Sequence, residues 1–282
     1  MAIHIETPHV DEVSGVQGVG QGPQLLSTSK GLEVIVGPLL NYRRMSNEQS
    51  GAPVWHGSVL IVTTPGQQDP QLTLSPGGAV DSSMENSSFT SAESRTFNGE
   101  RLYEDPNKAF WRFTIDAPFQ EFESRWTYDI RGLTHVGETR EEKPQTFVIP
   151  AISQSMRILF HSCNGFSVGT DVDAWSGPAL WNDVLRRHEQ KPFHVMLGGG
   201  DQIYNDSVRV NGGPLESWTA IGNPHKRREF PFGEKLRDDC DEFYFQNYKN
   251  WYGHKPFSTA NGQIPQVNIW DCLLYTSDAA DE

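Results

Sequence analysis

The residues best suited to chemistry follow the apolar run Phe193–Leu197, which leads directly into Gly-Gly-Gly-Asp201-Gln-Ile-Tyr204. A short apolar run ended by glycines is typical of a buried strand in a parallel sheet. Ligands in open α/β sheets bind beyond the carboxyl ends of such strands, and glycines let the backbone turn or approach a ligand closely. The pattern therefore predicts that Asp201 and Tyr204 lie at a metal or phosphate site. The alternative is that Asp201 only caps the next helix.

Two further strand-like runs end in residues that could bind a metal. Met156–Phe160 leads towards Cys163, and Ile264–Trp270 leads into Asp271. A thiolate, a phenolate and carboxylates together suit a strongly Lewis-acidic ion better than magnesium, which prefers oxygen ligands and water. We therefore predict a metal site at the ends of these strands.

From about residue 150 to residue 271 the chain resembles the first half of the PhoD-type alkaline phosphatases and phosphodiesterases, within the calcineurin-like metallophosphoesterases. The motifs that carry the resemblance are Ser162-Cys163, Gly200-Asp201-Gln-Ile-Tyr204, Tyr248, Pro265 and Ile269-Trp270-Asp271. The resemblance is to the PhoD-related type common in fungi. It implies that Cys163, Asp201 and Tyr204 bind a metal, with iron and calcium as the metal content and other divalent metals as alternatives.

Two more residues are candidates with two readings each. Asn164 contacts a substrate phosphate or forms an Asx turn. Asp271 is a metal ligand, or it hydrogen-bonds a histidine that is one.

The family pattern continues after Asp271 with a second Asp, a His and an acidic residue, and this chain departs from it. The sequence here is Cys-Leu-Leu-Tyr-Thr-Ser-Asp-Ala-Ala-Asp-Glu over residues 272–282. We interpret this tail as the translation of a sequencing adapter; the alternative is a natural polar C-terminus. The interpretation predicts a truncated enzyme that lacks its catalytic histidine and is inactive as it stands.

The function implied by the resemblance is metal-dependent hydrolysis of a small phosphoester, by in-line attack of water on phosphorus. Two other functions stay open. The chain could be a β-sandwich binding module joined to a degenerate phosphatase domain. It could also be another metallophosphoesterase, such as a nucleotide pyrophosphatase, which would share Asp201 but would not be expected to use Cys163 and Tyr204.

Composition limits the partners and the compartment. The formal net charge of −13 argues against nucleic acid as a partner. No apolar run approaches the roughly 20 residues that span a bilayer, and the N-terminus has no secretory signal pattern. Apart from the tail, the cysteines are Cys163 and Cys240, so no disulfide framework is indicated. These features predict a cytoplasmic protein with no integral membrane segment.

The pattern along the chain predicts a β-sandwich followed by an α/β domain. Residues 1–29 are expected to be a flexible arm, residues 30–150 an immunoglobulin-like or fibronectin-like sandwich, and residues 151–271 the N-terminal half of an αββα-type metallophosphoesterase domain. Within residues 121–130, an alternation of apolar and polar residues predicts a half-buried strand whose apolar face carries Phe122, Trp126, Tyr128 and Ile130.

A helix over residues 178–188 is expected to join the strands that lead to Cys163 and Asp201. Such a βαβ unit brings both residues to the same sheet edge. A second helix over residues 234–252 carries a largely aromatic stripe at helical spacing that we expect to be core. Its members are Leu236, Cys240, Phe243, Tyr244, Tyr248 and Trp251.

Three other polar features have a structural and a functional reading. His161 and His194 lie within strand runs and are expected to be hydrogen-bonded core histidines rather than ligands. The basic run His225–Arg228 is expected to be a solvated loop face, with binding of an anion as the alternative.

Overall fold

The computed structural model describes residues 31–46, 53–81, 83, 93–166, 169–171 and 173–269. The predicted N-terminal arm, Asp271 and the predicted adapter tail lie outside the described residues. The strands are β1 (Leu32–Ser46), β2 (Val54–Thr63), β3 (Gln71–Ala79), β4 (Arg95–Asn98), β5 (Glu100–Glu104), β6 (Ala109–Pro118), β7 (Ser124–Ile130), β8 (Leu133–His135), β9 (Gln145–Ile149), β10 (Ile158–His161), β11 (Val195–Gly198) and β12 (Gln266–Asn268). The helices are α1 (Ala179–Gln190), the 3-10 turn η2 (Asp206–Arg209), α2 (Glu216–Thr219), α3 (Pro224–Arg228), α4 (Glu234–Gly253) and α5 (Phe257–Gln263).

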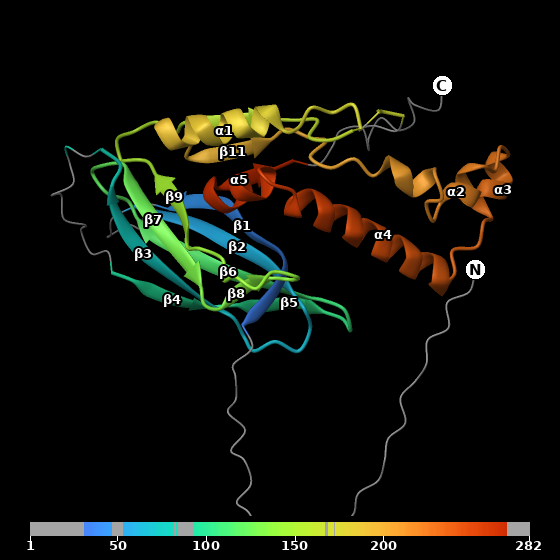
Figure 1. Ribbon diagram of the computed structural model, residues 1–282, viewed down its shortest axis with the longest axis horizontal. Helices are drawn as coiled ribbons and strands as arrows, with labels where there is room; N and C mark the ends of the chain where they lie inside the picture. Colours follow the sequence, from blue (N-terminus) through green and yellow to red (C-terminus); the bar gives the residue numbers. More distant parts are fainter. Residues whose placement is uncertain are drawn as a thin grey trace, which may run out of the picture. The chain divides into compact units, whose positions relative to one another are not determined.

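The described strands form two sheets (Figure 1). The larger sheet is mixed and has the order β10-β11-β12-β1-β2-β6-β5, with β8 pairing beside β1. The smaller sheet has the order β4-β3-β7-β9 and is antiparallel. The described part of the protein is thus mostly sheet, as predicted.

The two sheets enclose the main hydrophobic core. Every second residue of β6 is buried, from Ala109 through Trp111 and Phe113, because successive strand side chains point to opposite faces. From the other sheet, Trp126, Tyr128 and Ile130 of β7 enter the same core. The sequence had predicted this apolar face, and the burial of those residues confirms it. The core contains the largest fully buried side chains, among them three tryptophans: Trp55, Trp111 and Trp126.

The parallel strands β10, β11 and β12 continue the larger sheet. β12 pairs in parallel with β1, with Asn41 opposite Gln266, so a single sheet runs through residues on both sides of position 150. The two segments predicted as separate domains therefore share one sheet. This joins the β11 strand end rigidly to the sandwich.

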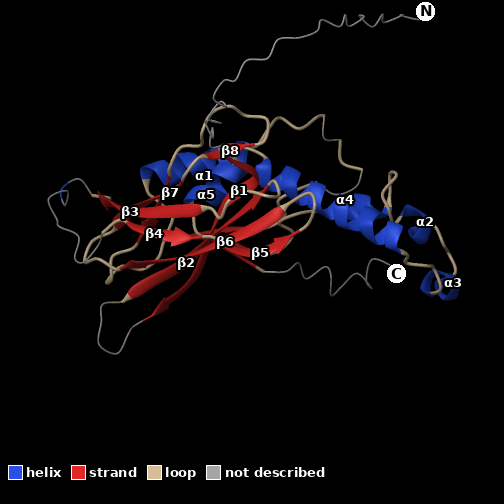
Figure 2. Cartoon of the chain, turned by 90° about the horizontal axis from the view of Figure 1, so that it is seen from below, coloured by secondary structure: helices blue, strands red, loops and turns tan. Residues whose placement is uncertain are grey.

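Helices cover the outer side of the larger sheet (Figure 2). Phe245 and Tyr252 of α4 pack on Val36, Leu39 and Val62 of β1 and β2. Side chains of α1 and α5 pack around Met196 of β11. The described residues do not contain a second α/β sheet, so the predicted αββα arrangement stays a prediction. None of the helices described in the structure combines the length and the apolarity that a membrane crossing requires.

Candidate functional site

The predicted βαβ unit brings Cys163 and Asp201 to one edge of the sheet. β10 and β11 are parallel, with His161 opposite Gly198, and α1 lies between them in the chain. Backbone hydrogen bonds continue past the strand ends: Gly199 N donates to His161 O (2.7 Å), and Asn164 N donates to Asp201 O (2.8 Å). The two loops are therefore held side by side beyond the ends of their strands.

Both loops contain a residue in the left-handed backbone region. Cys163 has φ 54° and Asp201 has φ 53°, and among the described residues Asn211 is the other non-glycine residue with positive φ. A side chain makes this conformation costly, by about 1–3 kcal/mol. Such strained residues cluster at functional sites, where the surrounding structure enforces them. Here both Cys163 and Asp201, which face each other across the two loops, have this strained conformation.

Two side chains that could lose a proton, those of Cys163 and Tyr204, converge on one carboxylate oxygen of Asp201. The Cys163 thiol donates to Oδ2 of Asp201 (3.6 Å), and the Tyr204 hydroxyl donates to the same atom (3.4 Å). Partial burial, together with Cys163 and Asp201, raises the pKa of Tyr204 to about 12. The arrangement thus places a carboxylate against two groups that would repel it once ionised, and a cation would relieve this.

Tyr204 is held in place from two sides. A Cβ added to Gly165 would lie 2.5 Å from Cδ2 of Tyr204, so only glycine leaves room for the phenol ring. From α4, Asn247 Nδ2 donates to the carbonyl of Tyr204 (2.9 Å) and to Oδ1 of Asn205 (2.8 Å). The phenol oxygen is therefore directed towards Asp201 by contacts outside the motif.

Gln202 links the site to the neighbouring strand. Its Nε2 donates to the carbonyls of Gly198 (3.1 Å) and Ile269 (2.9 Å). Ile269 directly follows β12, and its own N–H donates to Gly198 O (3.0 Å). The ends of β11 and β12 are thus fixed together at the same sheet edge as Asp201.

Comparison with known proteins identifies the family. A family model described as PhoD related phosphatase matches residues 119–273, just over half of the chain. The chain belongs to this family. An uncharacterized protein of Saccharomyces cerevisiae is 29% identical over 254 residues, which cover 84% of this chain and 34% of the yeast protein. The chain thus spans about a third of that relative's length.

The family assignment confirms the resemblance seen in the sequence and supports a phosphatase, a kind of hydrolase, as the type of protein. The matched segment begins after β6 and contains Cys163, Asp201 and Tyr204. Strands β1 to β6 lie before the matched segment. The candidate site therefore belongs entirely to the part of the chain that is recognisably a PhoD related phosphatase.

The outcome is different for Asn164 and Asp271, the other two predicted site residues. Asn164 uses its amide within the protein: Oδ1 accepts from Trp181 Nε1 (2.7 Å), and Nδ2 donates to Gln202 O (3.4 Å). These contacts position the Cys163 loop. Contact of Asn164 with a substrate stays a prediction. Asp271 lies outside the described residues, and within them no three His, Cys, Asp or Glu side chains gather into one metal-binding group.

The two strand histidines differ from one another. His194 is fully buried and hydrogen-bonded, as predicted. His161 has no hydrogen-bond partner among the described residues for either ring nitrogen, and its ring packs edge-on against Trp181 (5.2 Å between centroids). The prediction of a hydrogen bond was therefore wrong for His161. Burial lowers the pKa of its imidazole, which favours the neutral ring.

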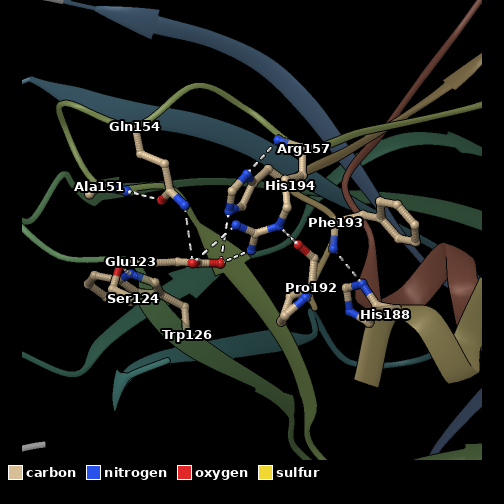
Figure 3. A network of polar contacts seen from close by, with 10 residues as sticks. All are labelled: Glu123, Ser124, Trp126, Ala151, Gln154, Arg157, His188, Pro192, Phe193 and His194. Carbon is tan, nitrogen blue, oxygen red and sulfur yellow. Dashed lines mark hydrogen bonds and ion pairs between the residues drawn. The ribbon is translucent and has the colours of Figure 1, made fainter. Parts of the chain in front are cut away.

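At the opposite ends of the same strands, a polar network joins them to the sandwich (Figure 3). The Arg157 guanidinium forms an ion pair with Glu123, which precedes β7, and donates through Nε to Pro192 O (2.6 Å). The backbone N–H of Arg157 donates to Nδ1 of His194 (2.8 Å). His194 Nε2 lies 3.0 Å from Oε1 of Glu123. Because Nδ1 accepts a hydrogen bond, the ring proton is on Nε2, which donates to Glu123.

The network changes the acidity of its members. Burial opposes ionisation of Glu123, but hydrogen bonds from Arg157, Gln154 and His194 outweigh it and lower the pKa of that carboxyl. Burial, reinforced by Arg157, lowers the pKa of His194. Nearby, His188 accepts a hydrogen bond from the N–H of Phe193 (3.0 Å), and burial lowers the pKa of His188 to about 4. The folded protein thus holds an ionised Glu123 beside neutral histidines.

Proposed function

We propose that the protein is a metal-dependent phosphoester hydrolase in which Cys163, Asp201 and Tyr204 hold a metal ion. The observation that carries the proposal is the convergence of the Cys163 thiol and the Tyr204 hydroxyl on one oxygen of Asp201. The membership in a phosphatase family supports the reaction type. The positive φ of Cys163 and Asp201 supports a functional reason for the strained loops.

The chemistry of the three donors fits iron. Ferric iron is a strong Lewis acid, and a thiolate with a phenolate suits it better than magnesium or calcium, which take oxygen ligands. Calcium would need many more oxygens than the Asp201 carboxylate offers. An Asp201 that is only a helix cap would leave the left-handed Cys163 unexplained. We therefore propose iron at this position, and the calcium implied by the family resemblance stays a prediction.

The residues of this chain would orient the metal and the substrate. When bound, the metal would supply a Lewis acid that polarises the phosphoester and promotes ionisation of water. Cys163 and Tyr204 would each lose a proton on binding, so the affinity should fall as the pH falls. Asn164 would hold the Cys163 loop to the Asp201 loop, because its amide donates to the carbonyl of Gln202. Gln202 would tie the Asp201 loop to Gly198 and Ile269, and Asn247 would hold the backbone of Tyr204.

We propose that this chain supplies only part of the active site. It spans about a third of the yeast relative, and the family resemblance implies a histidine and further ligands after residue 271. Turnover would then need a longer form of the protein, whereas metal binding by Cys163, Asp201 and Tyr204 would be measurable in the present chain. Asp271 would complete the ligand set or orient the missing histidine.

The decisive experiment measures iron content, visible absorption and hydrolysis of 4-nitrophenyl phosphate and bis(4-nitrophenyl) phosphate. It uses the 282-residue chain and a longer form in which the family pattern continues directly after Asp271. Thiolate and phenolate ligands on ferric iron should give a charge-transfer band. Asp201→Asn should weaken iron binding by more than the roughly 10–100-fold that loss of an outer hydrogen-bonding partner costs.

Matched variants distinguish side chains that bind the metal from those that do not. Asp183→Asn is the control, because the Asp183 carboxylate bonds only Arg186 and Arg187 on the surface of α1. Tyr204→Phe should shift or bleach the band, and Cys163→Ser should lower the iron affinity further. A colourless iron-loaded protein, or a band that ignores both substitutions, would show that these side chains are not ligands. Unchanged turnover of Asp201→Asn in the longer form would show that the Asp201 carboxylate is not a metal ligand.

A further inference from the structure

A second candidate site lies between the first turn of α4 and the segment that contains α2 and α3. A cavity of about 520 Å³ opens there. Small-molecule pockets usually enclose about 300–1,000 Å³ and are mainly apolar, with a few polar groups. The cavity is lined by Leu215, Trp218, Pro224, Arg227, Arg228, Phe230, Phe232 and Leu236.

One wall of this cavity is fixed by mutual contacts of Trp218 and Arg227. The Trp218 indole N–H donates to the carbonyl of Arg227 (3.1 Å), and the Arg227 guanidinium lies 5.4 Å from the centre of a Trp218 ring. The same guanidinium donates to the carbonyls of Ile221 (3.0 Å) and Thr219 (3.3 Å). Arg227 therefore serves the fold, and two of its guanidinium nitrogens, Nε and one Nη, already donate to backbone carbonyls.

Arg228 differs from its neighbour. Its side chain is exposed at the cavity and makes no ion pair or hydrogen bond with another described residue. Phe232, also a lining residue, is 54% exposed. An unpaired cation thus stands beside open aromatic surface in a chain of formal charge −13. Glu229 and Glu234, which border the same loops, carry the opposite charge but form no ion pair with Arg228 among the described residues.

We propose that this cavity binds one amphipathic anion. An alkyl or aryl group would contact Trp218, Phe230 and Phe232, and a phosphate or carboxylate head group would bind the Arg228 guanidinium. Arginine suits both head groups, because its planar fork donates two parallel hydrogen bonds. A single-chain alkyl phosphate or a fatty carboxylate has this chemistry, and a cavity of this size takes one such molecule.

The proposed cavity is separate from the metal site. Leu236 is in the first turn of α4, whereas Asn247, which holds Tyr204, is eleven residues further along. At 1.5 Å per residue the two positions are about 16 Å apart along the helix axis. A ligand in the cavity would therefore not touch Cys163 or Asp201, and the proposal does not depend on phosphatase activity.

The test is a calorimetric titration of the 282-residue chain with dodecyl phosphate and decanoate, both kept below micelle formation. Dodecyl maltoside is the neutral probe, and inorganic phosphate is the probe without a chain. We expect the two amphipathic anions to bind at least about tenfold more tightly than either control probe. The indole N–H resonance of Trp218 should shift on binding.

Two matched pairs of variants locate the contacts. Arg228→Gln should weaken dodecyl phosphate about tenfold, whereas Arg237→Gln, an exposed arginine of α4 outside the lining, should not. Phe232→Ser should weaken both anions, whereas Leu180→Ser, at an exposed leucine of α1, should not. Circular dichroism checks that each variant folds.

Three results would overturn the proposal. The first is equal affinity for dodecyl phosphate and dodecyl maltoside. The second is binding that Arg228→Gln and Phe232→Ser leave unchanged in folded protein. The third is binding to anionic vesicles with none to the monomeric anions, which would assign the surface to a membrane instead.

Discussion

At the N-terminal ends of β10 and β11, the ionised side chains of Glu123 and Arg157 and the neutral ring of His194 are joined to one another, whereas at the C-terminal ends Cys163, Asp201 and Tyr204 face one another with no positively charged side chain among the three. The same pair of strands carries both groups. The first has opposite charges in contact. The second gathers only groups that are neutral or negative.

The backbone conformation also differs between the two ends of these strands. Cys163 and Asp201 both have φ near +54°, while no residue of the Glu123 network is among the described non-glycine residues with positive φ. Paired charges and relaxed backbone are expected where a contact serves stability. A strained backbone persists only where the surrounding structure enforces it, and so does a cluster of side chains that would repel one another once ionised. Both are typical of sites that bind a ligand. This difference is consistent with a stabilising role for the Glu123 network and with the metal site that we propose at Cys163, Asp201 and Tyr204.

The largest effect should come from Glu123→Ala. The substitution leaves the Arg157 guanidinium and the Nε2–H of His194 without their shared acceptor in a mostly buried site. We expect a loss of about 3 kcal/mol in the free energy of unfolding, measured by urea denaturation. The exposed pair Asp183–Arg187 supplies the control: Asp183→Ala should cost at most about 0.5 kcal/mol. Equal losses for the two variants would remove the distinction drawn for the N-terminal end.

Acid should also weaken the N-terminal end. His188 and His194 have lowered pKa values in the folded protein, so the unfolded chain takes up protons first as the pH falls. The stabilisation is fully present above the ordinary histidine pKa of 6.5 and is lost as the pH falls towards the folded pKa of His188, about 4. For His188 this amounts to up to about 3 kcal/mol.

The measurement is the free energy of unfolding between pH 7 and pH 4. His188→Asn keeps an acceptor for the N–H of Phe193 but does not titrate, so its stability should depend less on pH. Lowering the pH further should protonate Glu123, whose pKa is also lowered, and remove the ion pair with Arg157. A stability that does not change from pH 7 to pH 4 would contradict the neutral state assigned to these histidines.

Sequence reasoning predicted that Cys163 and Asp201 lie together at one end of the strands, but it did not find the Glu123 network at the other end. The Cys163 and Asp201 strands are joined by one helix, so their shared edge follows from a local βαβ pattern. Glu123 lies 34 residues from Arg157 and 71 from His194. In the sequence, Glu123 falls on the polar face of an alternating strand, and nothing in that alternation indicates which distant cation it meets.

The aromatic stripe of α4 shows a second limit. Its spacing predicted a buried face, but Tyr244 is 38% exposed and Tyr248 is 46% exposed, so that prediction was wrong for these two. Cys240 is buried, as expected. Periodicity gives the face of a helix but not how far the sheet beneath it extends. Asn247, which holds Tyr204, lies on the same helix and carried no signal in the sequence.

Relief of strain should give a smaller effect of opposite sign. Cys163→Gly removes the Cβ from a left-handed residue, so we expect the metal-free protein to gain about 0.5–1 kcal/mol in the free energy of unfolding. Asn211→Gly, at φ 55°, is the control for the backbone effect, and its gain should be smaller because Asn tolerates this region better. Thermal unfolding measures both. A loss of stability for Cys163→Gly would show that its side chain stabilises the fold.

The smallest effect on stability should come from Tyr204→Phe, and a second tyrosine makes it informative. Tyr128 is buried in the sandwich core, and its hydroxyl donates to the carbonyl of Gly262 (2.7 Å). Tyr128→Phe leaves that carbonyl without its partner and should cost about 1–2 kcal/mol. The Tyr204 hydroxyl makes a long contact of 3.4 Å with Asp201 and also interacts with Cys163, both in a partly exposed site, so Tyr204→Phe should cost less than about 0.5 kcal/mol.

With iron bound, the order of the two tyrosines should reverse. Tyr204→Phe should change the visible absorption and lower the iron affinity, whereas Tyr128→Phe should leave both unchanged. Measuring stability and iron binding for both variants therefore distinguishes a tyrosine hydroxyl that stabilises the fold from one that binds a metal. If Tyr204→Phe proved as destabilising as Tyr128→Phe and left iron binding intact, Tyr204 would be a packing residue. The Tyr204 hydroxyl would then not be a metal ligand, and the contrast between the two strand ends would not hold.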